Sequence, residues 1–131
     1  MTARLSRLKT RAEFLRVAAA RARAARPGLV LQAAPRPDEP EGELRVGYTA
    51  SRRVGNAVVR NRAKRRLRAA AAAVLPRHGK AGVDYVLVAR EGTGTRPYAA
   101  LLGDLEGALR QLARPQPVRP QSARQARGGE G

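Results

Sequence analysis

Alanine accounts for 26 of the 56 apolar residues in this 131-residue chain, so few side chains are large enough to fill a hydrophobic core. The other 30 apolar residues suit a single domain in which one or two helices pack on one small sheet. No apolar run approaches the ~20 residues that cross a bilayer, and the N-terminus lacks the apolar stretch of a secretory signal. The absence of cysteine excludes disulfides, thiolate zinc sites and cysteine nucleophiles.

Hydrophobic periodicity and turn residues predict an alternation of helices and strands. A capping box formed by Thr10 and Glu13 begins the first helix, and Pro27-Gly28 stops it. The predicted elements are a helix over 11–23, strands over 29–34 and 44–50, a helix from 56 to about 75 that ends at Pro76 and Gly79, a strand over 83–89 and a helix over about 98–113.

The same pattern predicts how the strands pair. The first two strands are expected to be antiparallel neighbours. The long helix separates the second strand from the third, so these two should be parallel. The third strand is nearly all apolar and is expected at the centre of the sheet. Residues 1–9 are expected to be flexible, and 114–131 to form a disordered basic tail after a single domain over 1–113.

Positive charge is the strongest functional signal. The chain has 27 Lys and Arg residues against 10 Asp and Glu, a formal charge of +17, which indicates a polyanionic partner. The charge is also segregated, because residues 51–68 contain eight basic residues and no acid. Residues 1–26 contain eight more against the single acid Glu13. Such segregation is typical of a docking surface, the alternative being a solvated helix face.

Residues 51–68 combine several sequence features that are typical of phosphate binding. Gly55 allows a tight turn with close backbone approach, and Asn56 can cap the helix that follows. The positive end of that helix attracts anions. Arg60, Lys64 and Arg68 are spaced i,i+4, where like charges weaken an isolated helix and so favour an anionic partner.

Residues able to do catalysis are few. The single histidine, His78, lies in a turn and is interpreted as an ordinary surface residue. No metal-ligand cluster, paired general acid and base, or glycine-rich phosphate loop is recognisable in the sequence. The chain is therefore expected to bind a polyanionic partner without catalytic or metal-binding residues of its own.

The run RVGNAVVRNRAKRRLR over 53–68 resembles the signature of the bacterial ribonuclease P protein component. Its core is the triplet Arg60-Asn61-Arg62 followed by Lys64-Arg65. Supporting matches are Arg7-Leu8 with Phe14, the run Leu44-Arg-Val-Gly47, and the strand end from Tyr85 to Ala89-Arg90. Together these matches cover residues ~5–113 in the family's order.

The resemblance implies a fold and a function. The fold is a small α+β sandwich with a mixed sheet of about four strands, in the order αβββαβα, and a left-handed crossover through the long helix. The function is that of a cofactor in a ribonucleoprotein endonuclease that removes the 5′ leader of precursor tRNA in the cytoplasm. The catalytic RNA subunit holds the Mg²⁺ ions, and no membrane or protein partner is implied.

The resemblance also implies two sets of binding residues. The set for the catalytic RNA is Arg53, Asn56, Arg60, Asn61, Arg62, Lys64, Arg65 and Arg68. The set for the single-stranded leader is Phe14, Val30, Gln32, Thr49, Ser51, Arg52 and Arg90. The sequence departs from the family where aromatic residues are common, at Ala18 and Gln32, so stacking on the leader is expected to be weak.

Two other functions are compatible with a basic α+β domain. A general RNA-binding or ribosome-associated structural protein would not need the ordered spacing of the signature. A protein-only nuclease would need clustered carboxylates or histidines, and the sequence shows no obvious set.

Overall fold

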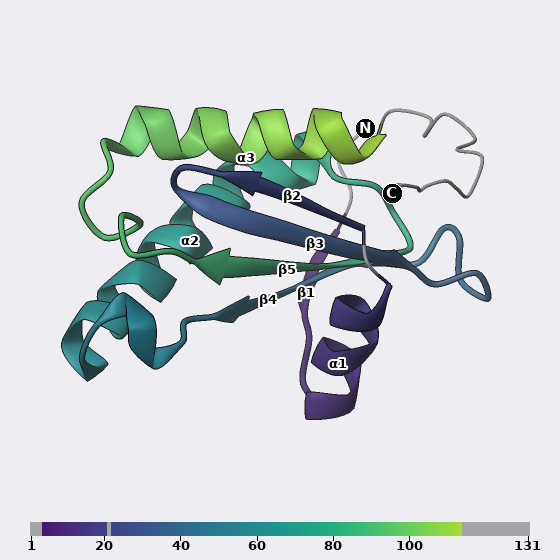
Figure 1. Cartoon of the computed structure of the whole chain (residues 1–131). Helices are drawn as coiled ribbons and strands as arrows, with labels where there is room; N and C mark the ends of the chain where they lie inside the picture. Colours follow the sequence, from purple (N-terminus) through teal and green to yellow (C-terminus); the bar gives the residue numbers. More distant parts are fainter. Residues whose placement is uncertain (1–3, 21, 114–131) are drawn as a thin grey trace, which may run out of the picture.

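A five-stranded mixed sheet lies at the centre of the structure, a computed structural model that describes residues 4–20 and 22–113 (Figure 1). Helices lie on both faces of this sheet. In chain order the elements are β1 (Leu5–Arg7), α1 (Arg11–Ala19), β2 (Ala22–Arg26), β3 (Leu29–Pro35), β4 (Leu44–Thr49), the 3₁₀ helix η1 (Arg52–Val54), α2 (Ala57–His78), β5 (Val83–Ala89) and α3 (Tyr98–Ala113). The α+β class is confirmed, with five strands in place of about four.

Strand β5 is the central strand of the sheet, whose order is β1-β4-β5-β3-β2. It pairs parallel to β4 and antiparallel to β3, which confirms the parallel pairing across the long helix. The prediction that the strands over 29–34 and 44–50 are neighbours was wrong, because β5 inserts between them. An almost fully apolar strand gains most when it is covered on both sides, and this favours the central place.

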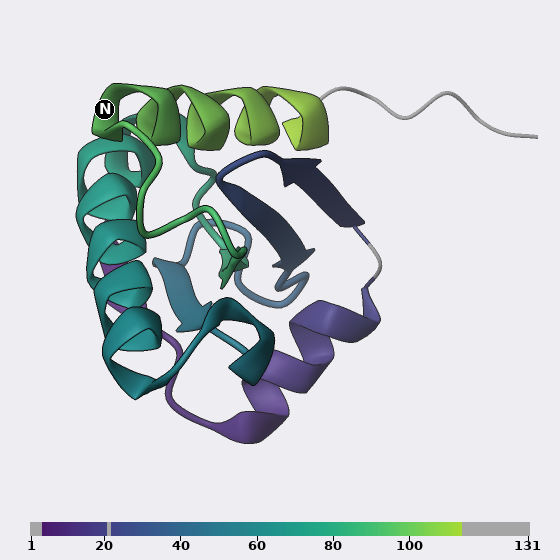
Figure 2. The ribbon, with the colours of Figure 1, turned by 60° about the vertical axis from the view of Figure 1, so that its left-hand side comes forward.

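The crossover from β4 through α2 to β5 is left-handed, as the family resemblance implied. In Figure 1 both strands point to the left, β5 lies above β4, and α2 runs behind the sheet. The turned view in Figure 2 places α2 and α1 on opposite sides of the sheet, which confirms that α2 lies behind it. Most parallel crossovers are right-handed, so this connection identifies an uncommon topology.

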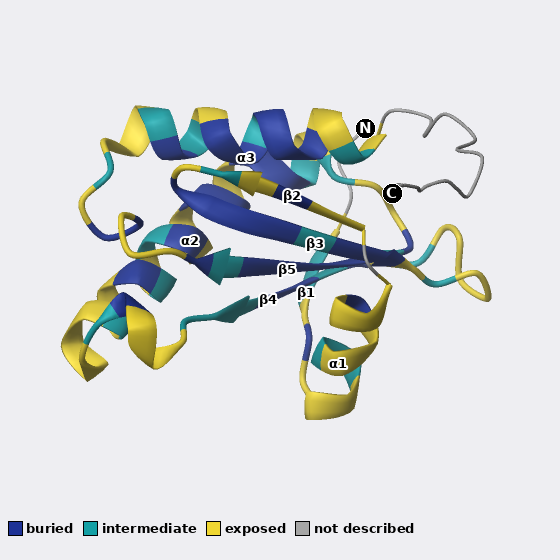
Figure 3. Ribbon diagram, in the orientation of Figure 1, coloured by how far each residue is buried: buried dark blue, intermediate teal, exposed yellow. Residues whose placement is uncertain are grey.

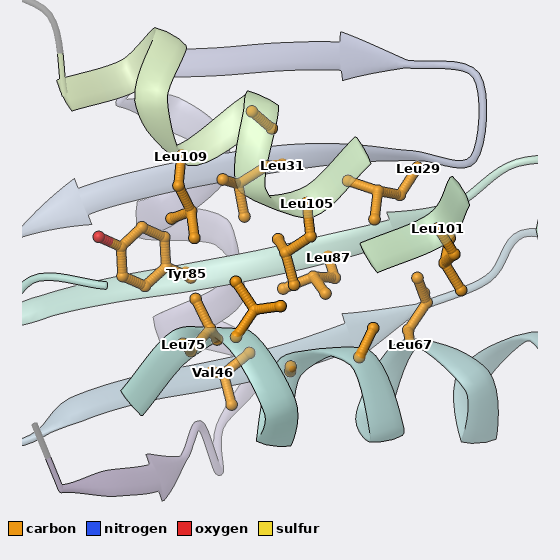
Figure 4. Close-up of a cluster of buried hydrophobic side chains, with 14 of the residues drawn as sticks. Leu29, Leu31, Val46, Leu67, Leu75, Tyr85, Leu87, Leu101, Leu105 and Leu109 are labelled. Carbon is orange, nitrogen blue, oxygen red and sulfur yellow. The ribbon is translucent and has the colours of Figure 1, made fainter. Parts of the chain in front are cut away.

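Helices α2 and α3 cover one face of the sheet and form the main core. Leucines of β3 and β5 meet leucines of both helices there, with Val46 and Tyr85 among them (Figure 4). Helix α1 packs on the other face around Val17, which is fully buried against Ala34 and Val86. Figure 3 shows that α1 stays largely exposed while β3 and β5 are buried. The α1 face is therefore only partly covered.

The N-terminal third differs most from the prediction. Residues 5–7, expected to be flexible, form the edge strand β1, which pairs with β4. The first helix ends at Ala19, and residues 22–26 form β2, which makes a hairpin with β3 around Pro27-Gly28. Alanine favours helices, but burial of Ala24 in the main core stabilises the strand more than helix propensity would stabilise a helix here. Tertiary packing therefore overrides local propensity.

Helix α2 is longer than predicted. Asn56 caps its start, as expected, because its side-chain oxygen accepts a hydrogen bond from the Val59 backbone N–H at 2.9 Å. Pro76 lies inside the last turn, and the helix continues to His78 before Gly79. A proline removes only one hydrogen bond from the helix, and the final turn tolerates that loss. The predicted basic tail over 114–131 lies outside the described residues, and no described helix is long and apolar enough to span a membrane.

Candidate nucleic-acid interface

The turn before α2 is built around Gly55. Its backbone has φ 151°, a region that favours glycine, and a Cβ there would also collide with the side chain of Val59. The turn therefore depends on glycine for both its conformation and its packing. It directs the chain from η1 into α2, so that the start of the helix and its first arginines face solvent.

Helix α2 carries seven cations of which none forms an ion pair within the described part of the chain: Arg60, Arg62, Lys64, Arg65, Arg66, Arg68 and Arg77. The buried stripe of the helix is Ala63, Leu67, Ala70, Ala71, Val74 and Leu75. At about 100° per residue, Arg60, Lys64 and Arg68 follow one border of that stripe, while Arg62 and Arg65 point further outward. The helix thus presents an unneutralised cation surface (Arg60, Asn61, Arg62, Lys64, Arg65, Arg68).

Arg66 has a different role from its neighbours. Its guanidinium donates to the backbone carbonyl of Thr93 at 2.7 Å and to that of Arg96, so it joins α2 to the loop that precedes α3. Of the eight basic residues over 51–68, one is therefore occupied by the fold. The sequence spacing alone does not separate Arg66 from Arg65.

The strand register places three predicted leader residues, Val30, Gln32 and Thr49, on the α1 face. Thr49 pairs with Val88, and Val88 pairs with Val30, in one row across the sheet. The next row runs from Gly47 through Val86 to Gln32. Helix α1 covers the second row, and the first row borders the half-open surface beside it, which we name the α1 cleft (Phe14, Val30, Gln32, Thr49, Val88).

Phe14 of α1 lies directly on the backbone of Gly47. A Cβ atom at Gly47 would overlap the ring, so only glycine lets the ring approach the sheet this closely. Tyr48 and Tyr85 belong to the opposite face, and Tyr98 begins α3. Phe14 is thus the aromatic side chain available in the α1 cleft, and the exposed Ala18 adds no stacking surface.

The remaining predicted leader residues gather at the ends of β4 and β5. A cavity of about 480 Å³ is lined there by Ser51, Arg53, Val54 and Arg90, among others. The Arg90 guanidinium donates to the carbonyl of Arg26 at 2.8 Å, which fixes its direction. Arg52 lies exposed on η1 beside the cavity. The structure thereby groups Arg53, predicted with the catalytic-RNA set, with residues of the leader set.

A buried carboxylate that the sequence analysis did not single out fastens α1 to the sheet. Asp84 is fully buried and receives hydrogen bonds from three arginines. Arg45 binds it with two nitrogens, each at 2.7 Å, Arg16 of α1 donates at 2.7 Å, and Arg36 donates from the loop after β3. Arg45 also donates to Glu13 at 3.0 Å. We name this group the Asp84 cluster (Glu13, Arg16, Arg36, Arg45, Asp84).

The arginines keep Asp84 ionised. Burial by itself raises the pKa of this carboxyl, but the hydrogen bonds from Arg45, Arg16 and Arg36 outweigh it and lower the pKa to about 2. The pKa of Glu13 is lowered by the backbone N–H groups of Lys9 and Thr10. Asp84 of β5 and Glu13 in the first turn of α1 are thus two stable negative charges where α1 meets the sheet.

The comparisons with known proteins bear on this geometry. The sequence model of the family described as Ribonuclease P matches residues 2–113. The chain belongs to the ribonuclease P protein family. A ribonuclease P protein component of Paramagnetospirillum magneticum is 57% identical over 114 residues, covering 86% of both chains. One from Gluconacetobacter diazotrophicus is 50% identical over 111 residues, covering 85% of this chain and 94% of the relative.

Solved structures of ribonuclease P proteins share the fold. The Staphylococcus aureus RNase P protein superposes with a TM-score of 0.67 at 26% identity, over 82% of this chain and 94% of that one. The Thermotoga maritima protein gives a TM-score of 0.63 at 22% identity, over 86% and 99% of the two chains. The family resemblance of the signature is therefore confirmed. The chain is a protein component of the ribonuclease P ribonucleoprotein, an endoribonuclease of tRNA 5′ maturation in which RNA is catalytic.

The ribonuclease P chain has a further basic residue beside the α1 cleft. Arg23 of β2 is the register partner of Gln32 and is exposed. Because Ala24 points into the main core, the alternation of a strand directs Arg23 to the α1 face. Arg23 was not predicted as a site residue because the first helix was expected to extend over 11–23. No group of three or more metal-ligating side chains occurs among residues 4–20 and 22–113.

Proposed function

We propose that the cation surface of α2 binds the RNA subunit of ribonuclease P, and that the α1 cleft holds the 5′ leader of precursor tRNA. The observation that carries the first assignment is the absence of any ion pair to the seven cations of α2 in the described chain. Seven like charges on one helix are costly until phosphates neutralise them, and each phosphate contact releases counterions.

The assignment of the leader rests on shape and chemistry. A single RNA strand is bound by a basic groove with stacking side chains, and the cleft offers Phe14 with Arg23 and Arg90 nearby. The cavity at Ser51 and Arg53 begins two residues after Thr49 of the cleft and is also lined by Val54 of η1, which precedes α2. A strand lying in the cleft would therefore reach the cation surface, which brings the leader close to the RNA subunit.

The protein contributes binding and charge screening in this proposal, and the RNA subunit contributes the Mg²⁺ ions. Protein cations reduce the repulsion between the two RNAs, so cleavage should become possible at lower Mg²⁺. We also propose that the complex acts in the cytoplasm. A general RNA-binding role would give affinity without stimulation of cleavage.

The decisive experiment is cleavage of a precursor tRNA at low Mg²⁺. Three reactions contain this protein alone, the RNA subunit of ribonuclease P from P. magneticum alone, and both together. Cleavage at the mature 5′ end only in the combined reaction is expected. Cleavage by the protein alone would contradict an RNA-based activity. Binding without stimulation would favour the general RNA-binding alternative.

Gly47→Val tests whether the α1 cleft binds the leader. Because the new side chain would displace the ring of Phe14, we expect a loss of about 1–3 kcal/mol in binding of precursor tRNA, the usual value of one base–aromatic stack. Affinity for mature tRNA should stay unchanged, since it has no leader. The measurement is binding of both tRNAs to the reconstituted complex.

Phe14→Leu is the matched variant for this prediction. It removes the ring directly, so it should have the same selective effect, and the double variant should lose no more than either single one. Thermal unfolding of each variant separates a displaced ring from a disrupted fold. Equal losses for precursor and mature tRNA would contradict the assignment of the cleft.

A further inference from the structure

Tyr48 and Arg68 form a pair on the sheet face opposite the α1 cleft. Tyr48 of β4 packs against the main core beneath α2, and the guanidinium carbon of Arg68 lies 5.6 Å from the centre of its ring. This separation is within the range of a cation–π contact. Burial raises the pKa of Tyr48, while the positive charges of Arg68 and Arg7 lower it, so both arginines lie near the phenol.

A hollow of about 200 Å³ lies beside this pair, between β1, β4 and α2. Leu5, Val46 and Ala72 supply apolar lining, and Arg7 and Arg68 supply charge. Pockets that enclose a whole small ligand are typically larger, roughly 300–1,000 Å³. The size therefore suits one unit of a longer strand and does not suit a free cofactor.

Arg7 and Arg68 are both available to a ligand. Neither forms an ion pair or a side-chain hydrogen bond within the described residues, whereas Arg16, Arg36 and Arg45 are all occupied by Asp84. No acid lines the hollow. The hollow thus combines apolar lining with two guanidinium groups that have no counterion. A ligand that has both an anionic group and an apolar part would fit this combination.

We infer that Arg7, Tyr48 and Arg68 form a site for one nucleotide of the RNA subunit, separate from the α1 cleft. Tyr48 holds the guanidinium of Arg68 flat, so that its outer side offers a plane on which a base can stack. Arg7 neutralises the adjoining phosphate. The site deepens the proposed function, because Arg60, Lys64 and Arg68 are spaced i,i+4 along α2 and would lead an RNA strand bound there to this hollow, which Arg68 lines.

The test measures binding of the full chain to the RNA subunit of P. magneticum ribonuclease P over a range of salt concentrations. Arg7→Ala should weaken binding about tenfold and reduce the steepness of the log–log salt dependence by about one. Tyr48→Leu should weaken binding at least about fivefold but leave the salt dependence unchanged, because it removes no charge. Tyr48→Phe keeps the ring and should bind as the unchanged protein does.

The most specific measurement is the energetic coupling between Tyr48 and Arg68 in binding of the RNA subunit. In the Arg68→Ala background, Tyr48→Leu should cause no further loss, since Tyr48 acts through Arg68. The control is Arg110→Ala, which removes an exposed charge from α3, far from the hollow. The preference for precursor over mature tRNA should stay unchanged in every variant, because the site and the α1 cleft lie on opposite faces of the sheet.

Three outcomes would overturn the inference. The first is that Arg7→Ala has no more effect than Arg110→Ala. The second is full additivity of Tyr48→Leu and Arg68→Ala, and the third is a selective loss of precursor binding. Failure of the unchanged protein to bind the RNA subunit at all would instead overturn the proposed function, together with the inference that depends on it.

Discussion

Asp84→Asn is expected to lower the free energy of unfolding by about 3 kcal/mol, the largest stability effect of any single substitution considered for this protein. The substitution leaves three arginines around a buried neutral amide. Removal of one partner from a buried ion pair costs about 3–5 kcal/mol, because the remaining charge loses its counterion without regaining water. The lower end applies because Arg16 and Arg45 are partly exposed. Urea denaturation measures the difference.

Acid unfolding provides an independent check on the same residue. The folded-state pKa of Asp84 is about 2, below its ordinary value of 3.8, so the ionised carboxylate stabilises the fold. This contribution is complete above pH 4 and is lost as the pH falls through 2. A difference of nearly two units corresponds to ~2 kcal/mol. Asp84→Asn should lack this part of the pH dependence.

Glu43→Gln is the matched control for Asp84→Asn. It breaks the ion pair with Arg4, whose atoms are 3.3 Å apart and whose side chains are 85% and 46% exposed. Exposed pairs contribute about 0–1 kcal/mol, so the stability should barely change. If Asp84→Asn were as stable as Glu43→Gln and unfolded along the same acid profile, the Asp84 cluster would not be what holds α1 to the sheet.

The long elements could be predicted from the sequence because their patterns are strong. Strand β5, helix α2 and helix α3 each carry a sustained apolar period, and turn residues mark most of their ends. Strands β1 and β2 escaped prediction because they are short and rich in arginine and alanine. Their strand conformation comes from pairing with β4 and β3, and such partners are not visible in local sequence.

The candidate site was only partly predictable for a related reason. The signature on α2 is contiguous, so its residues could be recognised together. Asp84 looked like an isolated acid in an apolar strand, because its partners Arg16, Arg36 and Arg45 are 68, 48 and 39 residues away. Likewise, nothing local distinguishes Arg66 from Arg65, since only the fold brings the Thr93 carbonyl to Arg66.

Replacement of Arg60 and Arg62 together by alanine should produce the largest functional loss. Both lie on the cation surface, Arg62 is exposed, and neither side chain forms a hydrogen bond or ion pair within the described residues. Affinity for the RNA subunit should fall roughly 10- to 100-fold, and the log–log salt dependence should become less steep by about 1.5, because two phosphate contacts are lost. Stability should change by less than ~0.5 kcal/mol, because Arg62 is exposed, Arg60 is half-buried and neither side chain has a polar partner to lose.

Arg66→Ala tests whether affinity for the RNA subunit depends on the number of positive charges on α2 or on their positions. It removes the same charge from the same helix, but Arg66 is occupied by the carbonyls of Thr93 and Arg96. We therefore expect the reverse pattern, with a loss of about 1–3 kcal/mol in stability and little change in the salt dependence of RNA binding. If Arg66→Ala and the Arg60/Arg62 double variant reduced RNA affinity equally per charge removed, total charge would govern binding. A loss confined to the double variant would mean that the RNA subunit is recognised by the arrangement of cations along one border of α2.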